Sequence, residues 1–308
     1  LIAGGGTGGH LFPALAIGDE LEKEGIRVSY IGSKHGIEAK VLSDKQKHHY
    51  LLDIKGIKRS FSFFDILDNI IFPYRFMKSL FNSKTIIIKE NPDLVIGTGG
   101  YSSGLPILAS LKLNKKTLIH EQNSFPGITT RKLSAKVDCV CISYEKTKDY
   151  INSNSILTGN PIRGDLKLYD KEIACSELGI HPNKKTLLLI GGSQGSKPFN
   201  DYFIKYYKDY TSSDIQIIWQ CGVKNYNEYR NFIKDKNIIV KGFINKIDLA
   251  YSAADLVISR AGALSISELS MMKKAMILIP FLLLNNPQHS SEKPCFQGLT
   301  CLHHLLRI

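Results

Sequence analysis

Residues 1–10 read LIAGGGTGGH, in which three apolar residues run straight into a glycine-rich turn. A stretch with helical periodicity follows from about Leu11 to Glu24, so the turn joins a strand to a helix. Such a turn lets backbone N–H groups and the positive end of a helix approach an anion closely. The sequence therefore predicts an α/β fold with an anion-binding loop at its start. Because three residues are short for a buried strand, we also expect part of that strand to precede Leu1.

Outward from this turn, short apolar runs alternate with amphipathic stretches along the chain. The runs that we interpret as strands span residues 26–31, 93–96, 117–119, 138–142, 186–190, 215–219, 238–240, 255–258 and 275–279. Strands separated by helices indicate parallel sheets with helices on both faces. The pattern restarts near Thr186, and Asn160-Pro161 suits a hinge because proline restricts the residue before it. We therefore predict two Rossmann-like α/β domains, residues 1–160 and 161–308.

The composition narrows the class of protein. The 308 residues suffice for two domains, and 40 Lys and Arg against 28 Asp and Glu give a net charge of +12. That excess favours an anionic partner, which could be nucleic acid, an anionic membrane or a phosphorylated ligand. The six cysteines have no metal-ligand spacing, and no apolar run reaches about 18 residues. We therefore expect reduced thiols in a cytoplasmic protein whose membrane contact is peripheral.

Two further glycine-rich segments follow expected strands, GTGGYSS at residues 97–103 and GGSQG at residues 191–195. Ligands of open parallel sheets bind beyond the carboxyl ends of the strands, so we expect both halves to present a ligand-binding edge. Gly4, Gly6 and Gly9 also fit a dinucleotide-binding fingerprint. In such a site an acidic residue ends the second strand and binds a ribose, whereas here that strand ends at Ser33. The sequence therefore disfavours NAD as a ligand.

Six segments together resemble the MurG family of bacterial glycosyltransferases, which convert lipid I to lipid II in peptidoglycan synthesis. The segments read GGGTGGHLFP (residues 4–13), GTGGYSS (97–103), HEQNSFPG (120–127), GNPIR (159–163), GGSQG (191–195) and SRAGALSISE (259–268). They keep the family's order and approximate spacing as far as Phe281. The resemblance implies a GT-B fold, in which two Rossmann-like domains face a cleft. It also implies that the first domain binds the acceptor and the second binds UDP-N-acetylglucosamine.

The resemblance implies roles for particular residues. The backbone of Ile244 would contact uracil, and the Glu268 carboxylate would accept hydrogen bonds from both ribose hydroxyls. The substrate-binding residues implied in this way are Thr7, Gly8, Gly9, Asn123, Arg163, Ser193, Ile244, Ala263, Leu264, Ser265, Ile266, Ser267, Glu268 and Gln288. On the acceptor side they are Gly99, Gly100 and Tyr101. For Glu268 the structural alternative is a solvated carboxylate that complements the dipole of its helix.

The implied chemistry is an inverting transfer, which needs a base for the acceptor hydroxyl and a site for the leaving diphosphate. His10 suits the base, because an imidazole titrates near working pH and follows the glycine turn directly. Glu121 is the alternative base, or the carboxylate that orients the base. A capping or packing role is the structural alternative for His10. Helix N-termini and Arg163 would hold the diphosphate, so no cofactor is required. A divalent cation stays open as an alternative, although the chain has no Asp-x-Asp pair to support one.

Residues 55–89 combine aromatic and basic side chains and read KGIKRSFSFFDILDNIIFPYRFMKSLFNSKTIIIK. That combination favours contact with an anionic membrane surface. The residues concerned are Phe61, Phe64, Ile71, Phe72, Phe76, Leu80 and Phe81, with Lys58, Arg59, Arg75, Lys78 and Lys84. A helix that faces the core is the alternative. Pro73 predicts two helices or one kinked helix.

The family pattern breaks after Phe281. Only Asn286 and Gln288 resemble the segment that the family carries there, and residues 290–308 show no helix of ordinary length. We expect a truncated or frameshifted end that weakens solubility and donor binding, with a divergent tail as the alternative.

The sequence as a whole predicts a hexosyltransferase that moves N-acetylglucosamine from UDP-N-acetylglucosamine to the muramyl sugar of lipid I. Its partners would be the nucleotide sugar, a polyprenyl-pyrophosphate-linked muramyl peptide and the cytoplasmic face of the bacterial membrane, with no nucleic acid. Two alternatives stay open. One is another UDP-sugar enzyme of the same fold, such as a glycolipid transferase or a UDP-N-acetylglucosamine epimerase; the other is an inactive chain that still binds UDP or membrane.

Overall fold

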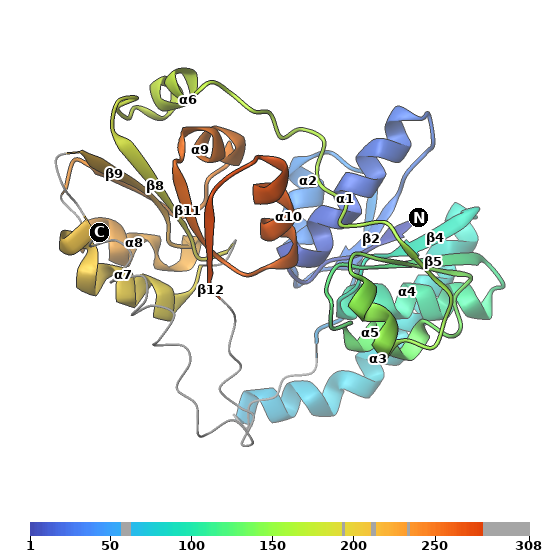
Figure 1. Cartoon of the computed structure of the whole chain (residues 1–308). Coiled ribbons are helices and arrows are strands. Elements are labelled where there is room, and N and C mark those ends of the chain that lie inside the picture. Colours follow the sequence, from blue (N-terminus) through green and yellow to red (C-terminus); the bar gives the residue numbers. More distant parts are fainter. Residues whose placement is uncertain (57–62, 193–194, 211–213, 233–234, 280–308) are drawn as a thin grey trace. The chain divides into compact units, whose positions relative to one another are not determined.

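The structure is a computed structural model that describes residues 1–56, 63–192, 195–210, 214–232 and 235–279. Expectations about Ser193 and about the tail, including Gln288, lie outside these residues. The chain divides into two compact units, Leu1–Gly164 and Asp165–Ile308 (Figure 1). Each unit is described by itself.

The first unit contains a parallel sheet of seven strands in the order β3-β2-β1-β4-β5-β6-β7. The strands are β1 (Ile2–Ala3), β2 (Tyr30–Ser33), β3 (His49–Leu52), β4 (Leu94–Gly97), β5 (Lys116–Glu121), β6 (Cys139–Ile142) and β7 (Ser155–Leu157). The helices are α1 (Gly8–Lys23), α2 (Glu38–Asp44), α3 (Phe63–Glu90), α4 (Tyr101–Lys112), α5 (Ile128–Leu133) and the 3-10 helix η1 (Glu145–Tyr150). The strand order reverses between β1 and β4, where Ala3 pairs with Gly97. The loops after these two strands therefore begin side by side.

The second unit contains a parallel sheet with the order β10-β9-β8-β11-β12. Its strands are β8 (Lys185–Ile190), β9 (Ile215–Gln220), β10 (Ile238–Lys241), β11 (Leu256–Arg260) and β12 (Met276–Ile279). Its helices are α6 (Lys171–Leu178), α7 (Lys197–Tyr210), η2 (Val223–Asn225), α8 (Tyr226–Phe232), α9 (Ile247–Ala253) and α10 (Ala263–Met271). Here the order reverses between β8 and β11, so the loops after those strands are neighbours.

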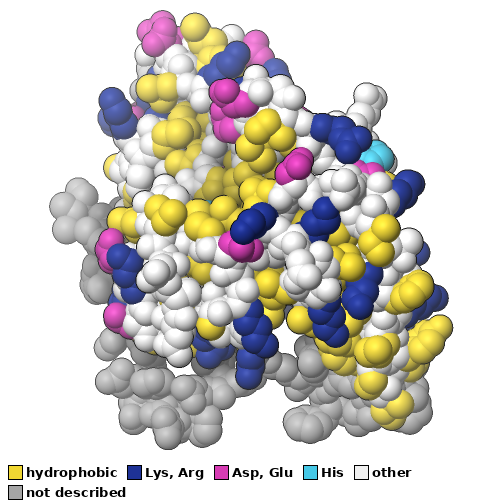
Figure 2. Space-filling model, turned by 90° about the vertical axis from the view of Figure 1, so that its right-hand side faces the viewer, with side chains coloured by type: hydrophobic (Ala, Val, Ile, Leu, Met, Phe, Trp, Pro, Cys, Tyr) yellow, Lys and Arg dark blue, Asp and Glu magenta, His cyan; other side chains and the backbone are white. Residues whose placement is uncertain are grey.

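Helices cover both faces of each sheet, which explains why the central strands read as continuous apolar runs. Successive residues of one strand enter different cores: Leu188 packs in the cluster beneath α6, α9 and α10, whereas Leu189 packs with Trp219 beneath α7 and α8. In the first unit, Ile2 and Ala3 of β1 likewise pack in two different core clusters. Apolar side chains also reach the surface, where Lys and Arg lie among them (Figure 2). The prediction of two parallel-sheet α/β units is confirmed.

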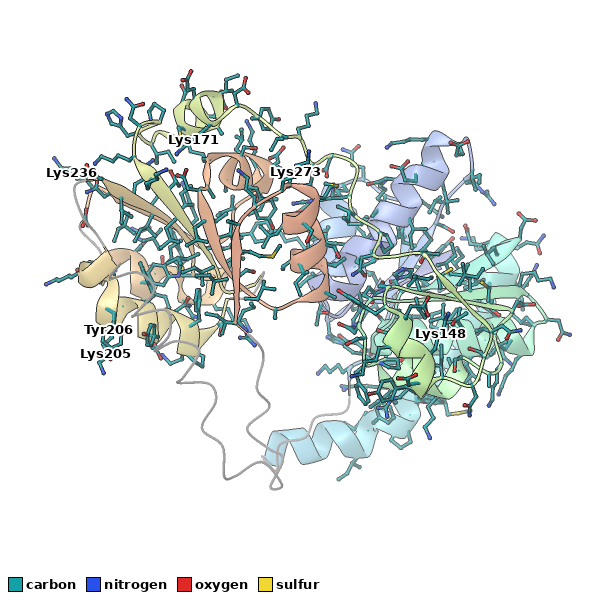
Figure 3. The ribbon with its side chains drawn as sticks, in the orientation of Figure 1. Lys148, Lys171, Lys205, Tyr206, Lys236 and Lys273 are labelled. Atoms are coloured by element: carbon teal, nitrogen blue, oxygen red, sulfur yellow. The ribbon has the colours of Figure 1, made fainter. Side chains whose placement is uncertain are left out.

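An ion pair fastens α6 to the sheet of the second unit. Lys171 (Figure 3) donates to Asp255 Oδ2 at 2.7 Å, and the backbone N–H of Thr186 donates to the same oxygen at 2.7 Å. Burial raises the pKa of the Asp255 carboxyl, but these two hydrogen bonds and the charges of Lys171 and Lys185 together hold that pKa below its ordinary value. The ionised carboxylate therefore links a helix to the start of two neighbouring strands.

The structure also differs from the sequence-based expectation in three places. Strands β3 and β7 were not expected, and the second strand occupies Tyr30–Ser33 rather than residues 26–31. Helix α3 runs through Pro73 as one element, so of the two expected arrangements, two helices or one kinked helix, the first is not found. Among the described residues, no helix combines the length and the apolar character that a membrane span requires.

Candidate active site

The two glycine loops of the first unit contact each other directly. Thr98, after β4, donates from Oγ1 to the carbonyl oxygen of His10 at 2.7 Å. Gly100 has a φ of 76°, and a β-carbon at this position would lie 2.7 Å from the carbonyl oxygen of Gly5. A side chain at Gly100 would therefore be strained and would also separate the loops. The close approach explains why glycines follow both strands.

Glu38, on α2, packs against the first glycine loop and accepts a hydrogen bond from its backbone. Its side chain is 0% exposed; Oε2 accepts a hydrogen bond from Gly6 N and Oε1 accepts one from Ser33 N, both at 2.8 Å. A β-carbon at Gly5, Gly32 or Gly36 would lie within 2.5 Å of the Glu38 side chain. The buried carboxylate thus occupies space that three glycines leave open. Glu38 was not expected from the sequence, although Gly32 and Gly36 shortly before it were a usable signal.

His10 lies in the first turn of α1, half-buried against the second glycine loop. Its Nδ1 lies 3.1 Å from the carbonyl oxygen of Thr98 and 3.1 Å from Gln122 Oε1. A β-carbon at Gly99 would lie 2.8 Å from Nδ1, so the ring packs closely on that loop. The structure therefore brings the predicted base together with Gly99 and Gly100 from the predicted acceptor side.

The carboxylate of Glu121, the alternative base, accepts hydrogen bonds from residues that follow it in the sequence. The side chain is 2% exposed and accepts hydrogen bonds from the backbone N–H and side-chain amide of Asn123, from Gly127 N and from Thr130 Oγ1, at 2.5 to 3.1 Å. These donors come from one short segment, which favours a role in shaping the loop. The residue of this segment that contacts His10 is Gln122, which the sequence analysis did not single out. A catalytic role for Glu121 stays a prediction.

Tyr101 begins α4, and its ring packs on the first glycine loop. A β-carbon at Gly6 would lie 2.7 Å from the ring, and one at Gly56 would lie 3.2 Å from it. Burial raises the pKa of the Tyr101 phenol, a hydrogen bond with Ser33 opposes this shift, and the charge of Glu38 adds to it. The phenol therefore stays protonated at neutral pH and can donate a hydrogen bond. Thr7, Gly8 and Gly9 form the start of α1, where backbone N–H groups have no acceptor within the helix.

In the second unit, Gln220 joins two loops at the carboxyl end of the sheet. The side chain is 4% exposed; Nε2 donates to the carbonyl oxygen of Gly192 at 3.0 Å, and Oε1 accepts from Ile244 N at 2.9 Å. Arg260 adds a second link, because Nη1 donates to Ser196 Oγ at 2.8 Å. The segment that contains Ile244, the glycine loop and the SRAG segment are therefore held together.

Residues Ala263 to Glu268 form most of α10, whose N-terminus follows Gly262. The first turn of this helix contains no acidic residue, so Glu268 is not the first-turn carboxylate of the structural alternative. Its Oε2 instead accepts a hydrogen bond from the Tyr251 hydroxyl at 2.9 Å. Arg163 is half-buried near the end of the first unit. Within the described ranges, no group of His, Cys, Asp and Glu side chains is arranged to hold a metal ion.

Comparison with known proteins agrees with this arrangement. Residues 1–142 match the glycosyltransferase family 28 N-terminal domain, and residues 186–291 match the glycosyltransferase family 28 C-terminal domain. The chain belongs to glycosyltransferase family 28. The two matched segments contain five of the six motifs, and GNPIR lies between them.

Individual members of family 28 are similar over most of this chain. Two relatives share the name UDP-N-acetylglucosamine–N-acetylmuramyl-(pentapeptide) pyrophosphoryl-undecaprenol N-acetylglucosamine transferase. The one from Christiangramia forsetii is 41% identical over 91% of this chain and 76% of its own length. The one from Flavobacterium psychrophilum is 39% identical over 91% of this chain and 77% of its own length. The crystal structure of Acinetobacter baumannii MurG is 27% identical, with a TM-score of 0.65 over 98% of this chain and 82% of that one. The predicted family, GT-B fold class and glycosyltransferase activity are confirmed.

In this family 28 chain, we expect Glu38→Gln to lower the free energy of unfolding by about 1–3 kcal/mol, because an amide NH₂ would face a backbone N–H and leave it unsatisfied. Denaturant unfolding of the variant and the parent measures the change. Glu145→Gln, which alters an exposed carboxylate of η1, is the matched control and should change stability by less than about 0.5 kcal/mol. Equal losses in the two variants would contradict a supporting role for Glu38.

Proposed function

We propose that this chain transfers N-acetylglucosamine from UDP-N-acetylglucosamine to the muramyl sugar of lipid I, which gives lipid II for peptidoglycan synthesis. The observation that carries the proposal is the 41% identity to a transferase of that name across 91% of this chain. The glycine-rich motifs of this chain lie at the carboxyl ends of the strands of the two sheets, where open parallel sheets bind their ligands.

The donor site that we propose lies on the second unit. The N–H of Ile244 already donates to Gln220, so its carbonyl oxygen is the group available to accept a hydrogen bond from N3–H of uracil. Glu268 would accept the ribose hydroxyls, and residues 263–267 at the N-terminus of α10 would face the diphosphate. Arg163, Ser193 and Gln288 complete the proposed set, the last two being outside the described residues.

The transfer needs one proton acceptor and one stabilised leaving group. The acceptor hydroxyl oxygen forms a bond to the anomeric carbon, its proton moves to Nε2 of His10, and the anomeric C–O bond to UDP breaks with its electron pair on the diphosphate. Backbone N–H groups at helix N-termini and the Arg163 cation stabilise that charge, so no cofactor is proposed. Thr7, Gly8, Gly9 and Asn123 would face the transferred sugar, and Gly99, Gly100 and Tyr101 the acceptor.

The proposal is tested by incubating the chain with UDP-N-acetylglucosamine and a short-chain lipid I analogue. We expect release of UDP together with a disaccharide product, and release of UDP should depend on the acceptor. Conversion of the donor without any acceptor would instead indicate an epimerase. Binding of UDP without either reaction would indicate an inactive chain.

We propose that α3 contacts the inner face of the bacterial membrane. Ile70, Tyr74, Met77, Phe81 and Ile88 are 63% to 69% exposed and recur at intervals of four, three, four and seven residues, which places them on one face of the helix. A stripe of large exposed apolar side chains is typical of an interfacial helix.

Two lysines of α3, Lys78 and Lys89, accompany this apolar stripe. Lys78 Nζ lies 5.8 Å from the centre of the Tyr74 ring, and Lys89 is exposed in the last turn of α3. Cations beside inserted apolar groups add attraction to anionic lipids. The net charge of the whole chain, +12, also favours attraction to an anionic surface.

The expectation that Phe76 and Leu80 face the membrane is wrong, whereas for the half-buried Phe72 it stays a prediction. Phe76 packs against the core cluster that contains Leu80, and the Phe72 ring lies 5.9 Å from the Phe76 ring. Helix α3 therefore has a core face and a separate exposed face, which the aromatic content of the segment did not distinguish. Phe61 lies outside the described residues, and the side chain of Phe64 is not described.

His10→Ala should lower turnover by about 100-fold or more and leave UDP binding nearly unchanged, because a general base contributes to the chemical step and not to donor affinity. Steady-state transfer and calorimetric titration with UDP measure the two quantities. Turnover equal to that of the parent chain would remove His10 from the mechanism.

Glu268→Gln should weaken UDP-N-acetylglucosamine binding by about 1–3 kcal/mol, because charge-assisted hydrogen bonds to the ribose are lost. Tyr251→Phe is the matched control, since it removes the hydroxyl that donates to Glu268 and keeps the carboxylate. Calorimetry that finds the larger loss in Tyr251→Phe would argue against the placement of Glu268 on the ribose.

Replacing both Tyr74 and Phe81 by Ser should reduce binding to anionic vesicles by about tenfold or more. The double replacement removes two exposed apolar side chains, and a loss of only about 1.4 kcal/mol of binding free energy already corresponds to tenfold. Transfer to a soluble acceptor analogue should stay close to the parent rate. The control replaces Ile173 and Val223, which are 52% and 67% exposed on the second unit. A vesicle-binding loss of the same size in that control would show that α3 has no special part in membrane contact.

A further inference from the structure

A series of hydrogen bonds connects His10 to the backbone of the GNPIR segment. His10 Nδ1 lies 3.1 Å from Gln122 Oε1, Gln122 Nε2 lies 3.0 Å from His120 Nδ1, and His120 Nε2 lies 2.9 Å from the carbonyl oxygen of Gly159. Gln122 is 2% exposed and His120 is 3% exposed. All four residues belong to the first unit.

The direction of each hydrogen bond follows from carbonyl oxygens, which only accept. His120 Nε2 must carry a proton because it faces the carbonyl oxygen of Gly159. Burial lowers the pKa of His120, against the opposing effects of that hydrogen bond and of the Glu121 charge. The neutral ring therefore presents an unprotonated Nδ1 to Gln122.

The same reasoning fixes the orientation of the Gln122 amide. Its NH₂ group donates to His120 Nδ1 and also to the carbonyl oxygen of His120, each at 3.0 Å. The reversed amide would place two acceptors against each other at that carbonyl. Gln122 Oε1 must therefore point toward His10.

His10 Nδ1 consequently faces two acceptors, Gln122 Oε1 and the carbonyl oxygen of Thr98. A nitrogen between two acceptors carries the proton. The neutral imidazole of His10 is therefore the Nδ1–H tautomer, and its lone pair lies on Nε2.

We propose that Gln122 is a positioning residue that, together with the carbonyl oxygen of Thr98, holds His10 as the Nδ1–H tautomer and so leaves Nε2 as the proton acceptor of the transfer. This inference rests on the proposed function, in which the acceptor hydroxyl gives its proton to Nε2. When the imidazolium forms, Nδ1–H keeps both acceptors, and its hydrogen bonds strengthen because the donor is then charged. His120 acts one step further away, by orienting the amide.

The inference is tested on the full chain labelled with ¹⁵N-histidine. At a pH where the ring is neutral, the His10 signals of the parent should show a protonated Nδ1 and an unprotonated Nε2; the His10→Ala variant assigns them. Gln122→Met removes one of the two acceptors and leaves the carbonyl oxygen of Thr98, so the share of the Nε2–H tautomer should rise above that of the parent. It should also lower kcat by about tenfold, less than loss of the base itself, with little change in the KM for the donor.

Gln122→Glu is the second variant, which keeps an acceptor beside Nδ1 and adds a negative charge. The negative charge favours the protonated imidazole. In a plot of kcat against pH, the acidic limb should therefore move to higher pH by about one unit. Gln216→Met is the matched control. Gln216 is a glutamine of the second unit, 4% exposed and bonded through its amide to His181 and Thr186. The control should leave the His10 signals and the pH profile unchanged.

Two results would overturn the inference: His10 signals in Gln122→Met that equal those of the parent, or an acidic limb that does not move in Gln122→Glu. Failure of the proposed function gives a different result. A His10→Ala variant with full activity would overturn the assignment of the base, whereas the nitrogen signals would still report on what Gln122 does to the ring.

Discussion

Two hydrogen bonds between Thr98 and His10 fix the geometry on which the first unit depends. The Thr98 hydroxyl donates to the His10 carbonyl oxygen, and the Thr98 carbonyl oxygen lies 3.1 Å from Nδ1 of the same residue. They form because β1 and β4 are adjacent parallel strands, with Ala3 opposite Gly97, so the residues that follow must meet. The position of the His10 ring is therefore a consequence of strand order, and the contacts with Gly99, Gly100 and Gln122 follow from it.

Much of this fold could be predicted from the sequence, and the failures have physical reasons. Strands buried on both faces read as apolar runs, so the central strands were found. Strands β3 and β7 stand at the two edges of their sheet, and their residues are mostly half-buried or exposed. Both also begin with a polar residue, HYLL and SIL, whereas the edge strands β10 and β12 of the other sheet begin with the apolar runs IIV and MILI and were found. In α3 the residue type also fails to predict burial, because Phe76 packs against the core and Phe81 is exposed although both are aromatic.

The motifs of the site could be predicted from the sequence, but the hydrogen-bond partners of its residues could not. The glycine loops and His10 follow from local sequence, whereas the contact of His10 with Gln122 joins residues 112 positions apart. Both units use a buried glutamine at the end of a strand or just beyond it: Gln122 links His10 to His120, and Gln220 links Gly192 to Ile244. A neutral amide can donate and accept at once, which lets one side chain hold two loops without burying a charge.

The space around Glu38 has a consequence for how such sequences can change over generations. A β-carbon at Gly32 or Gly36 would overlap the carboxylate, so a substitution at either position is tolerated only after Glu38 has been replaced by something smaller. Once Glu38 is lost, however, the N–H groups of Gly6 and Ser33 lose their acceptor, and an open glycine-lined space has no occupant. Each single step is therefore unfavourable, and only a combined replacement that also supplies an acceptor for these two N–H groups avoids both costs. These positions form one epistatic unit, and we expect them to persist or to be exchanged together in descendants of this chain.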